Sequence, residues 1–472
     1  MVFNSLTFVI FLGLVLLAHS LPLPWRLRKL NLVLASYLFY AAWNPPFVVL
    51  LWISTLVDWF AARAMGRTTS RPRRRALLIA SLSVNLGLLG AFKYGDFLLE
   101  NFRLLLAEVG VAYAPPALNL VLPVGISFYT FQTLSYTIDV YRGRLEPWPR
   151  FVDFALYVTF FPQLVAGPIV RAGDFLPQCR QPRRASSAQL GWGATLLLVG
   201  LFEKVVLADG VMAPVADAVY AAPESAGWVD AWIGTVAFSG QIFFDFAGYS
   251  TCAIGAGLCL GFVLPDNFRS PYAAIGFSDF WRRWHISLSS WLRDYLYIPL
   301  GGNRKGGARI LVNVMLTMLI GGLWHGAAWG FVVWGGIHGV LLVAERVARG
   351  RFGQAAWVGR AHGRIGLAIL TYVLVCLAWV FFRAESLADA LLLTRTMLAG
   401  SGANLELGRA QAAWVLGVTA VLLVGQWLLR DASLAAACRP VPWYLRSLLL
   451  ALLAIAILGV PGDDRAFIYF QF

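Results

Sequence analysis

The sequence predicts an all-α, polytopic membrane protein, and its composition and the spacing of its apolar runs support that prediction. Of its 472 residues, 59% are hydrophobic and 13% are charged, whereas soluble globular chains carry roughly 25% charged residues. The mean hydropathy is +0.69. Apolar runs recur along the whole chain at lengths near the roughly 20 residues that a transmembrane helix needs. A soluble globular architecture is therefore excluded.

The apolar runs give the candidate membrane spans in order. They cover residues 6–22, 30–43, 47–65, 76–94, 117–141, 151–170, 190–208, 228–263, 310–324, 327–347, 365–382, 412–429 and 445–460. Some of these runs are too short or too interrupted to cross alone, so we expect roughly ten or eleven crossings plus re-entrant or interfacial helices. The first run has no basic region before it, which indicates a first span and not a cleaved signal peptide. No long linker or internal repeat is evident, so residues 1–472 are predicted to form a single domain.

The net charge of +14 comes from 38 Lys and Arg residues against 24 Asp and Glu residues. The basic residues cluster between apolar runs, as in Arg26–Lys29 and Arg63–Arg75. This positive-inside pattern predicts that the N-terminus lies outside and that the basic loops lie in the cytoplasm. Topology and contact with anionic lipids explain most of the charge, so no nucleic-acid partner is expected. A minority of the basic residues could contact an anionic soluble substrate.

The five cysteines indicate neither a disulfide framework nor a metal site. They show no CxxC spacing, and three of them lie inside apolar runs, where a cysteine behaves as a small core residue. No metal ligand set is predicted.

Two apolar segments are interrupted by proline and glycine. One runs from Leu122 to Phe128, and the other from Phe160 to Pro168. Irregular backbone at membrane depth is tolerated only where protein or a water-filled cavity satisfies its polar groups. Each segment is therefore either a kinked helix or the wall of a cavity.

His325 is the first candidate for chemistry. It lies in the string Gly321–Ala327, and no Asp, Glu, Lys or Arg occurs between Ile310 and Ala344. An ionisable side chain in such a stretch is costly and is a functional candidate by default. The flanking glycines would allow a substrate or another backbone to approach the ring closely. The alternative is a structural hydrogen bond from the imidazole to a backbone carbonyl of a neighbouring helix.

A second histidine, His285, lies in a basic and aromatic segment. Residues 278–299 are predicted to form one amphipathic helix in the membrane interface, with Ser278 as its N-cap. Its apolar face would comprise Phe280, Trp284, Leu288, Trp291 and Tyr295, with Arg282, Arg283 and Arg293 on the other faces. A flexible basic loop at 300–307, containing Asn303 and Arg304, follows. The segment is either an interfacial anchor or a cradle for a phosphate-bearing donor, because arginine donates bidentate hydrogen bonds to phosphate.

Other polar residues within apolar runs suggest bracing. Asp245 is the only charged residue between Ala231 and Pro265, and buried carboxylates of this kind are usually paired or functional. A brace is favoured over a part in substrate binding. Glu203 and Lys204 could form their own ion pair or extend their charged ends to the interface. His338 is interpreted as a packing residue.

Several strings, in order over nearly the whole chain, resemble the membrane-bound O-acyltransferase family and more closely its alginate O-acetylase branch. They are Pro123–Gln132, Phe161–Arg171, Phe244–Ser250, Asp279–Leu288, Pro299–Arg304, Leu323–Ala327 and Phe467–Phe472. The D-alanyl-transferring branch for teichoic acids shares the strings around the two histidines, but residues 297–304 look like the polysaccharide acetylase branch. Residues 251–253 read Thr-Cys-Ala, where that branch usually has Asp-Met-Ala, so the resemblance says less about this short stretch.

The resemblance implies a multi-helix bundle with a transmembrane tunnel in a bacterial inner membrane. It also implies an acyl-CoA donor from the cytoplasm, with no tightly bound cofactor, and a hydroxyl acceptor from the other side or from the bilayer. The implied activity is O-acetylation of an exopolysaccharide from acetyl-CoA, with alginate as the first candidate acceptor. His325 matches the family's catalytic histidine and His285 matches its second motif position.

The predicted roles follow from the chemistry of acyl transfer. A neutral histidine suits the removal of the acceptor's hydroxyl proton, so His325 is the predicted general base and His285 positions substrate or assists proton transfer. Trp324 and Trp329 would keep water from the reacting groups. Arg282, Arg283, Trp284, Asn303, Arg304, Trp324 and Asp245 are the candidate substrate- or donor-binding residues.

Two alternatives stay open. In the first, the chain relays the acyl group to a periplasmic partner acting on another polymer or on a lipid-linked acceptor, including D-alanyl transfer. In the second, the chain is a transporter, which would also explain broken helices and intramembrane polar residues. A transporter would show substrate-coupled flux without consumption of acyl-CoA.

Overall fold

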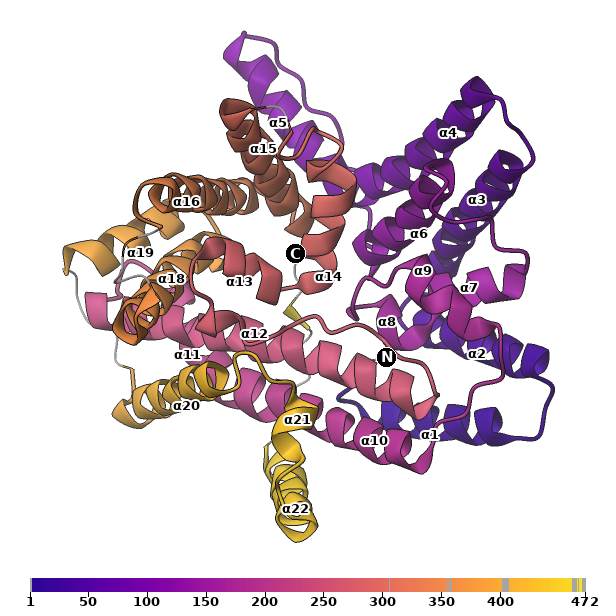
Figure 1. Ribbon diagram of the computed structural model, residues 1–472. Helices are drawn as coiled ribbons and strands as arrows, with labels where there is room; N and C mark the ends of the chain where they lie inside the picture. The colour runs from indigo at the N-terminus through magenta and orange to yellow at the C-terminus, as the bar shows by residue number, and fades with distance from the viewer. Residues whose placement is uncertain are drawn as a thin grey trace. The chain divides into compact units, whose positions relative to one another are not determined.

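The computed structural model describes residues 2–304, 306–353, 355, 359–400, 407–460, 465, 467 and 468. Within these residues all regular structure is helical (Figure 1). Seven helical segments are long and apolar enough to cross a membrane. They are Pro45–Gly66, Arg71–Glu108, Trp228–Cys259 (α12), Gly307–His325 (α15), Trp329–Phe352 (α16), Ala361–Arg383 (α18) and Arg409–Leu428 (α20). The all-α, multi-pass prediction is confirmed.

Fewer segments qualify as spans than the ten or eleven crossings predicted. Two shorter apolar helices, α1 (Leu6–Ser20) and α22 (Trp443–Gly459), add to the seven. Three predicted spans are interrupted in the structure. In 117–141 the helix α6 begins only at Ile126, and in 151–170 the helix α7 (Phe151–Thr159) ends before Pro162. In 190–208 the helix α10 (Ser187–Leu201) gives way to a π-helix, η4 (Phe202–Met212).

The described chain divides into two compact units. The first comprises Met1–Leu197 and Cys252–Pro265, and the second comprises Leu198–Thr251 and Asp266–Phe472. A single domain over residues 1–472 stays a prediction.

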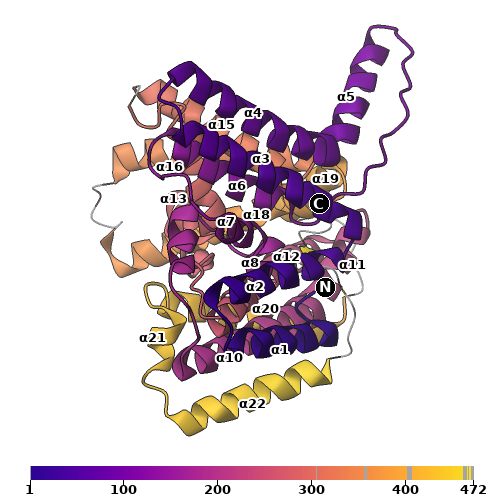
Figure 2. The same cartoon turned by 90° about the vertical axis from the view of Figure 1, so that its right-hand side faces the viewer.

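The first unit is held together by buried polar side chains. Its helices include α2 (Trp25–Ala41), α3 (Val48–Gly66), α4 (Arg71–Leu89), α6 (Ile126–Tyr141) and α7, and α3, α4 and α6 lie side by side (Figures 1 and 2). The carboxylate of Asp58 on α3 accepts hydrogen bonds from Ser81 and Asn85 on α4. The ammonium of Lys29 on α2 pairs with Asp153 on α7, and both side chains are buried. Because these charged and amide groups satisfy one another, the unit can bury them.

The two interrupted segments of the first unit are supported by protein groups. Gly125 has φ +76°, and a Cβ there would lie 2.7 Å from the carbonyl oxygen of Leu164, so this close approach requires glycine. The side-chain amides of Gln132 and Gln163 both donate to the carbonyl oxygen of Tyr157. Protein groups therefore satisfy part of this irregular backbone, as membrane depth demands.

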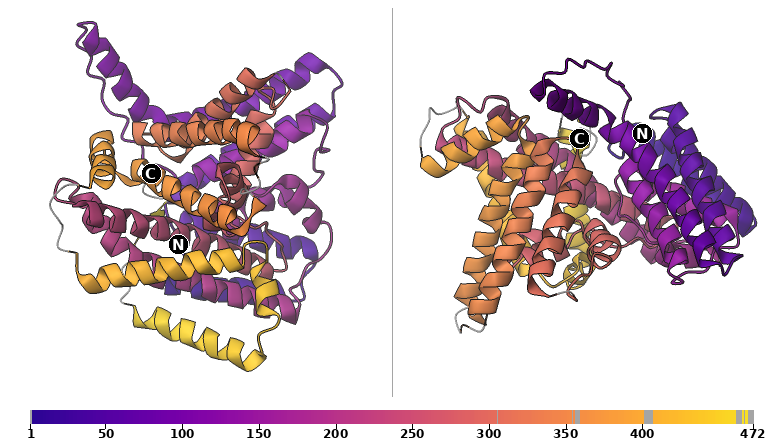
Figure 3. Two further views of the ribbon diagram at one scale, coloured as in Figure 1. Left: turned by 60° about the vertical axis from the view of Figure 1, so that its left-hand side comes forward. Right: turned by 90° about the horizontal axis from the view of Figure 1, so that it is seen from above.

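The second unit contains both candidate histidines. Its described helices include α11 (Ala213–Ala221), α12 up to Thr251, α13 (Phe277–Arg283), α14 (Ile286–Leu292), α15, α16, α18, α19 (Leu387–Ala399), α20, α21 (Leu434–Cys438) and α22. The predicted spans 310–324 and 327–347 correspond to α15 and α16, which pack as a hairpin, and α18 lies alongside α16 (Figures 1 and 3).

Small residues bring α15 and α16 into backbone contact. A Cβ at Gly322 would lie 2.2 Å from the carbonyl oxygen of Phe331, and one at Gly335 would lie 2.3 Å from that of Met318. Helices in membranes associate closely where glycine removes the side chain. The hairpin therefore fixes the end of α15, where His325 lies.

Candidate active site

His325 is the last residue of α15. The helix ends there because Gly326 adopts an extended conformation (φ −163°, ψ 156°), and α16 begins at Trp329. The long uncharged stretch is thus two helices, and His325 lies at the turn between them, where its side chain is 3% exposed. The carbonyl groups at a helix C-terminus carry partial negative charge, which stabilises a cation. This position favours the imidazolium that a general base forms when it accepts a proton.

Aromatic side chains surround the ring of His325. The ring centroids of Trp324 and Trp334 each lie 5.0 Å from it, and that of Phe382 lies 5.3 Å away. Trp324 is 4% exposed and fits its predicted role of excluding water. Trp329 is 53% exposed, so the prediction that it shields the reacting groups is wrong.

A cavity of about 520 Å³ has His325 and two arginines in its lining. Its lining includes Arg282 and Arg293, and it follows α15 from Val314 to His325. These eleven residues (325 − 314) span about 16 Å at the α-helical rise. The volume lies in the range of ligand pockets, which is roughly 300–1,000 Å³. A long, narrow ligand with an anionic end could therefore place its other end beside the imidazole.

The segment around His285 is two helices, so the predicted single helix over 278–299 is wrong. α13 ends at Arg283, His285 has a left-handed backbone conformation (φ +44°), and α14 starts at Ile286. A positive φ is uncommon for a residue with a side chain and marks a conformation that its surroundings impose. The residue before α13 is Gly276, so the predicted N-cap at Ser278 is also wrong. The apolar residues Phe280, Trp284, Leu288 and Trp291 are buried in the protein and do not face the interface.

Asn267 holds His285 in place. The side-chain oxygen Oδ1 of Asn267 accepts two hydrogen bonds from Ser287, one from the backbone N–H (3.3 Å) and one from the hydroxyl (2.9 Å). Nδ2 of Asn267 donates to Ser250 Oγ (3.1 Å). These contacts identify Oδ1 as the amide oxygen facing Nδ1 of His285, at 3.2 Å. Nδ1 must then carry the proton, which leaves Nε2 as the basic nitrogen of a neutral ring.

His285 stays neutral in the folded protein. Its side chain is completely buried, and burial lowers the pKa of His285 to about 3. Its ring centroid lies 6.5 Å from that of His325 and 4.7 Å from that of Phe246. The structure therefore brings the two predicted histidines together, although only His325 is among the residues that line the cavity.

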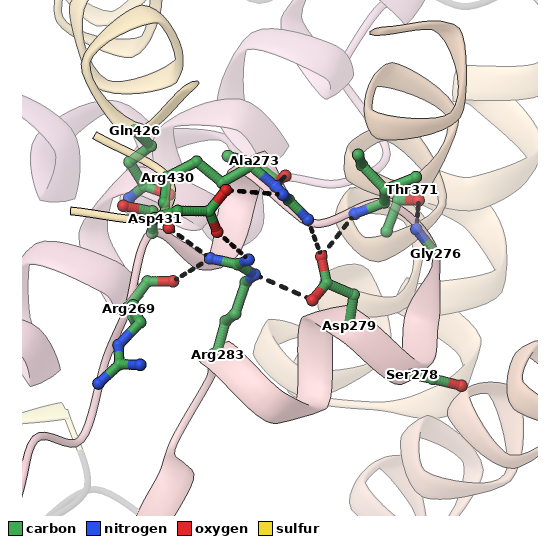
Figure 4. A network of polar contacts seen from close by, with 12 residues as sticks. Arg269, Ala273, Gly276, Ser278, Asp279, Arg283, Thr371, Gln426, Arg430 and Asp431 are labelled. Atoms are coloured by element: carbon green, nitrogen blue, oxygen red, sulfur yellow. Dashed lines mark hydrogen bonds and ion pairs between the residues drawn. The ribbon is translucent and has the colours of Figure 1, made fainter. Parts of the chain in front are cut away.

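The two adjacent arginines of α13 have different surroundings. Arg283 pairs with Asp279 (3.0 Å) and Asp431 (2.9 Å), and its guanidinium donates to the carbonyl oxygen of Arg430 (2.6 Å; Figure 4). Burial opposes ionisation of Asp279, but hydrogen bonds from the Ile275 N–H and from two guanidinium groups lower its pKa overall. Arg282 makes no hydrogen bond or ion pair with the described part of the chain, is exposed, and lines the cavity.

The other predicted binding residues also differ in their surroundings: some are buried in the core, and others are exposed. Trp284 is a core residue, 1% exposed, and stacks on Phe280. Asn303 accepts a hydrogen bond (2.7 Å) from the hydroxyl of Tyr297, which lines the cavity. Arg304 is exposed and is not among the lining residues, and Lys305 lies outside the described residues. Donor-binding roles for Arg283, Trp284, Asn303 and Arg304 stay predictions, and the geometry favours structural roles for the first two.

Asp245 joins a buried ion cluster. Its carboxylate lies 2.7 Å from Nζ of Lys204, which is also 2.9 Å from Asp209. The proposed pairing of Lys204 with Glu203 is therefore not the one that forms. The other carboxylate oxygen of Asp245 accepts a hydrogen bond (2.7 Å) from the backbone N–H of Ile468. The contacts support the brace interpretation of Asp245, because they tie α12 to η4 and to the C-terminal segment.

We expect Asp245→Ala to destabilise the protein by about 3 kcal/mol, because it leaves the buried ammonium of Lys204 with one of its two carboxylates. The measurement is the apparent unfolding temperature of the purified protein in detergent. The double variant Asp245→Ala/Lys204→Met removes the uncompensated charge and should recover part of the loss. An unfolding temperature for Asp245→Ala equal to that of the unaltered chain would contradict the brace.

The sequence interpretation missed Asn267 and Trp334. Trp334 is 1% exposed, lines the cavity and contacts His325. A tryptophan followed by two glycines within a span offered a weak signal for it. For Asn267 the only signal was an amide in the short polar stretch after Pro265.

A buried histidine pair, with the ring of His325 in the lining of a cavity, therefore lies among membrane-spanning helices. Residues 144–388 match the model of the membrane-bound O-acyltransferase family. The chain is 38% identical to a probable alginate O-acetylase of Pseudomonas putida, with all of both chains covered.

Two further relatives cover less of the chain. A peptidoglycan O-acetyltransferase of Helicobacter pylori is 39% identical over 80% of this chain and 75% of that protein. A teichoic acid D-alanyltransferase of Bacillus subtilis is 26% identical over 57% of this chain and 71% of that protein. This chain belongs to the membrane-bound O-acyltransferase family and is a multi-pass membrane O-acyltransferase.

Proposed function

We propose that this enzyme transfers the acetyl group of acetyl-CoA to a hydroxyl group of an exopolysaccharide, with alginate as the first candidate acceptor. The observation that carries the proposal is the cavity with Arg282 and Arg293 in its lining and His325 at the end of its path along α15. The names of the relatives, an alginate and a peptidoglycan acetylating enzyme, support acetyl as the group and a glycan as the acceptor.

The proposed reaction assigns the proton to His325. The acceptor hydroxyl attacks the thioester carbonyl carbon while the imidazole of His325 takes the hydroxyl proton. The carbon–sulfur bond then breaks, and the leaving thiolate takes the proton back from the imidazolium. The C-terminus of α15 stabilises the intermediate positive charge, and the surrounding aromatic rings limit hydrolysis of the thioester.

His285 acts as a neutral positioning group in this proposal. Its ring carries the proton on Nδ1, toward Asn267, so Nε2 can accept a hydrogen bond. Because burial lowers the pKa of His285 to about 3, it stays uncharged over the physiological pH range. In this proposal it positions substrate or assists proton transfer beside His325, and it does not compete with His325 for the proton.

We place the enzyme in the bacterial cytoplasmic membrane with its N-terminus in the periplasm. The basic stretches Arg26–Lys29 and Arg63–Arg75 support this orientation. In this orientation the basic loop at 300–307, before α15, lies on the cytoplasmic side. The donor would then enter from the cytoplasm. The acceptor would be reached from the opposite side.

Arg282 is the proposed contact for a donor phosphate. We expect Arg282→Gln to raise the KM for acetyl-CoA about tenfold, because a hydrogen bond between charged groups contributes about 1.5–3 kcal/mol. The kcat should change little, since the arginine does not touch the reacting atoms. Arg360→Gln, an exposed arginine outside the cavity lining, is the matched control. Equal KM values for all three proteins would remove Arg282 from the donor site.

The test of the function follows the label from radioactive acetyl-CoA. Purified enzyme in liposomes, with de-acetylated alginate inside, should label the polymer and release free CoA thiol. Label that reaches the polymer only when a periplasmic transferase is added would establish the relay instead. Absence of label transfer to polymer and partner alike, from protein that is correctly inserted, would overturn the proposal.

A further inference from the structure

A second cavity of about 710 Å³ lies in the second unit and shares Arg282 with the first cavity. α13 contributes residues to both cavities. Ser278 and Trp281 line the first, Phe277 and Asp279 line the second, and Arg282 lines both. The remaining walls of the second cavity come mainly from α16 and α18, which are membrane-spanning helices.

The polar end of this cavity has an excess of positive charge. Its lining contains four arginines and two acidic residues, so two positive charges (4 − 2) are not compensated. Arg349 pairs with Glu345 (2.6 Å), and Arg430 pairs with Asp279 (2.6 Å; Figure 4). The other two arginines, Arg282 and Arg364, form no hydrogen bond or ion pair with the described residues. Arg282 is the proposed donor contact in the first cavity, so Arg364 is the arginine available to a second anionic group.

The apolar walls extend from that end to the depth of one membrane leaflet. Arg349 and Arg364 lie at the adjoining ends of α16 and α18, whereas Leu341 and Leu374 line the cavity further along the two spans. From Arg364 to Leu374 there are ten residues (374 − 364), or about 15 Å at the α-helical rise. Half of the bilayer's hydrocarbon core is also about 15 Å thick.

We propose that this cavity binds an anionic phospholipid. The headgroup would contact the guanidinium group of Arg364, and one acyl chain would lie along Leu341, Leu367 and Leu374. Basic pockets between membrane helices suit anionic headgroups. A coenzyme A molecule fits the arginines but not the walls, because its polar pantetheine and nucleotide groups would lose water against leucine side chains.

The test measures lipid binding to the purified full-length protein by native mass spectrometry. Phosphatidylglycerol and phosphatidylcholine with identical acyl chains are titrated in parallel. We expect phosphatidylglycerol to bind about fivefold more tightly than phosphatidylcholine, since the one basic contact, to Arg364, contributes roughly 1 kcal/mol. Arg364→Gln should abolish this preference, and Arg364→Lys should retain most of it.

Arg360→Gln is the matched control, because Arg360 is exposed, lies four residues before Arg364 (364 − 360) and is not in the cavity lining. It should bind both lipids as the unaltered protein does. Equal binding of the two lipids, or an unchanged preference in Arg364→Gln, would overturn the proposal. A further experiment adds free CoA to the Arg282→Gln variant, which lacks the proposed CoA contact of the first cavity. Displacement of phosphatidylglycerol by CoA in this variant would assign the second cavity to a nucleotide and would also overturn the lipid proposal. None of these readouts depends on acetyl transfer.

Discussion

Replacement of His325 by alanine is expected to lower kcat for acetyl transfer by at least about 100-fold, the smaller end of what a positioned general base contributes. The KM for acetyl-CoA should change little, because the basic end of the cavity is intact. The measurement is transfer of label from acetyl-CoA by protein whose membrane insertion matches that of the unaltered enzyme. The loss follows from the position of His325, which is buried at the end of α15 and lines the cavity.

His338 supplies the control for this experiment. It is fully buried on α16 within 4.9 Å of the ring centroid of Trp334, and it is not in the cavity lining. Neither of its ring nitrogens hydrogen-bonds to the described residues. His338→Phe should therefore retain kcat within about threefold, since an aromatic ring of similar size keeps the packing. If His338→Phe loses as much activity as His325→Ala, the effect belongs to packing and His325 is not the base.

The sequence was sufficient to predict the helical membrane fold and to single out His325 as a candidate, because both depend on local patterns. A charge-free run of apolar residues indicates spans wherever it occurs, and a histidine within it is costly. The break at His285 could not be predicted in this way. The apolar residues from Phe280 to Tyr295 keep a helical period, yet α13 ends at Arg283 and His285 has φ +44°. Tertiary contacts impose that conformation, and no local pattern records them.

Two arginines that are adjacent in the sequence have different environments in the fold, and composition cannot show this difference. Arg282 and Arg283 are identical in sequence terms, but one faces the cavity and the other is bound by Asp279 and Asp431. Asp431 lies 148 residues from Arg283 along the chain. Only the fold decides which arginine remains available to a ligand.

Asn267→Leu should lower kcat about tenfold or more, because it removes the oxygen that fixes the proton of His285 on Nδ1. The leucine also leaves the buried hydroxyl of Ser287 without the acceptor that it has in the structure. Asn267→Asp keeps that oxygen and should retain more activity than the leucine variant. Ser250→Ala removes only the hydroxyl that accepts a hydrogen bond from Asn267 Nδ2 and should have a small effect. The measurement is kcat and KM for both substrates in each variant.

The combination with His285→Phe separates positioning from general loss of structure. If Asn267 acts through His285, adding Asn267→Leu to His285→Phe should reduce kcat little further, because the group that it orients is already absent. Independent effects would instead multiply, and a multiplied loss would show that Asn267 supports the fold and not the ring. Non-additivity of this kind is expected here because Asn267 and His285 are in direct contact at 3.2 Å. The kcat of the double variant therefore decides whether this amide belongs to the catalytic machinery.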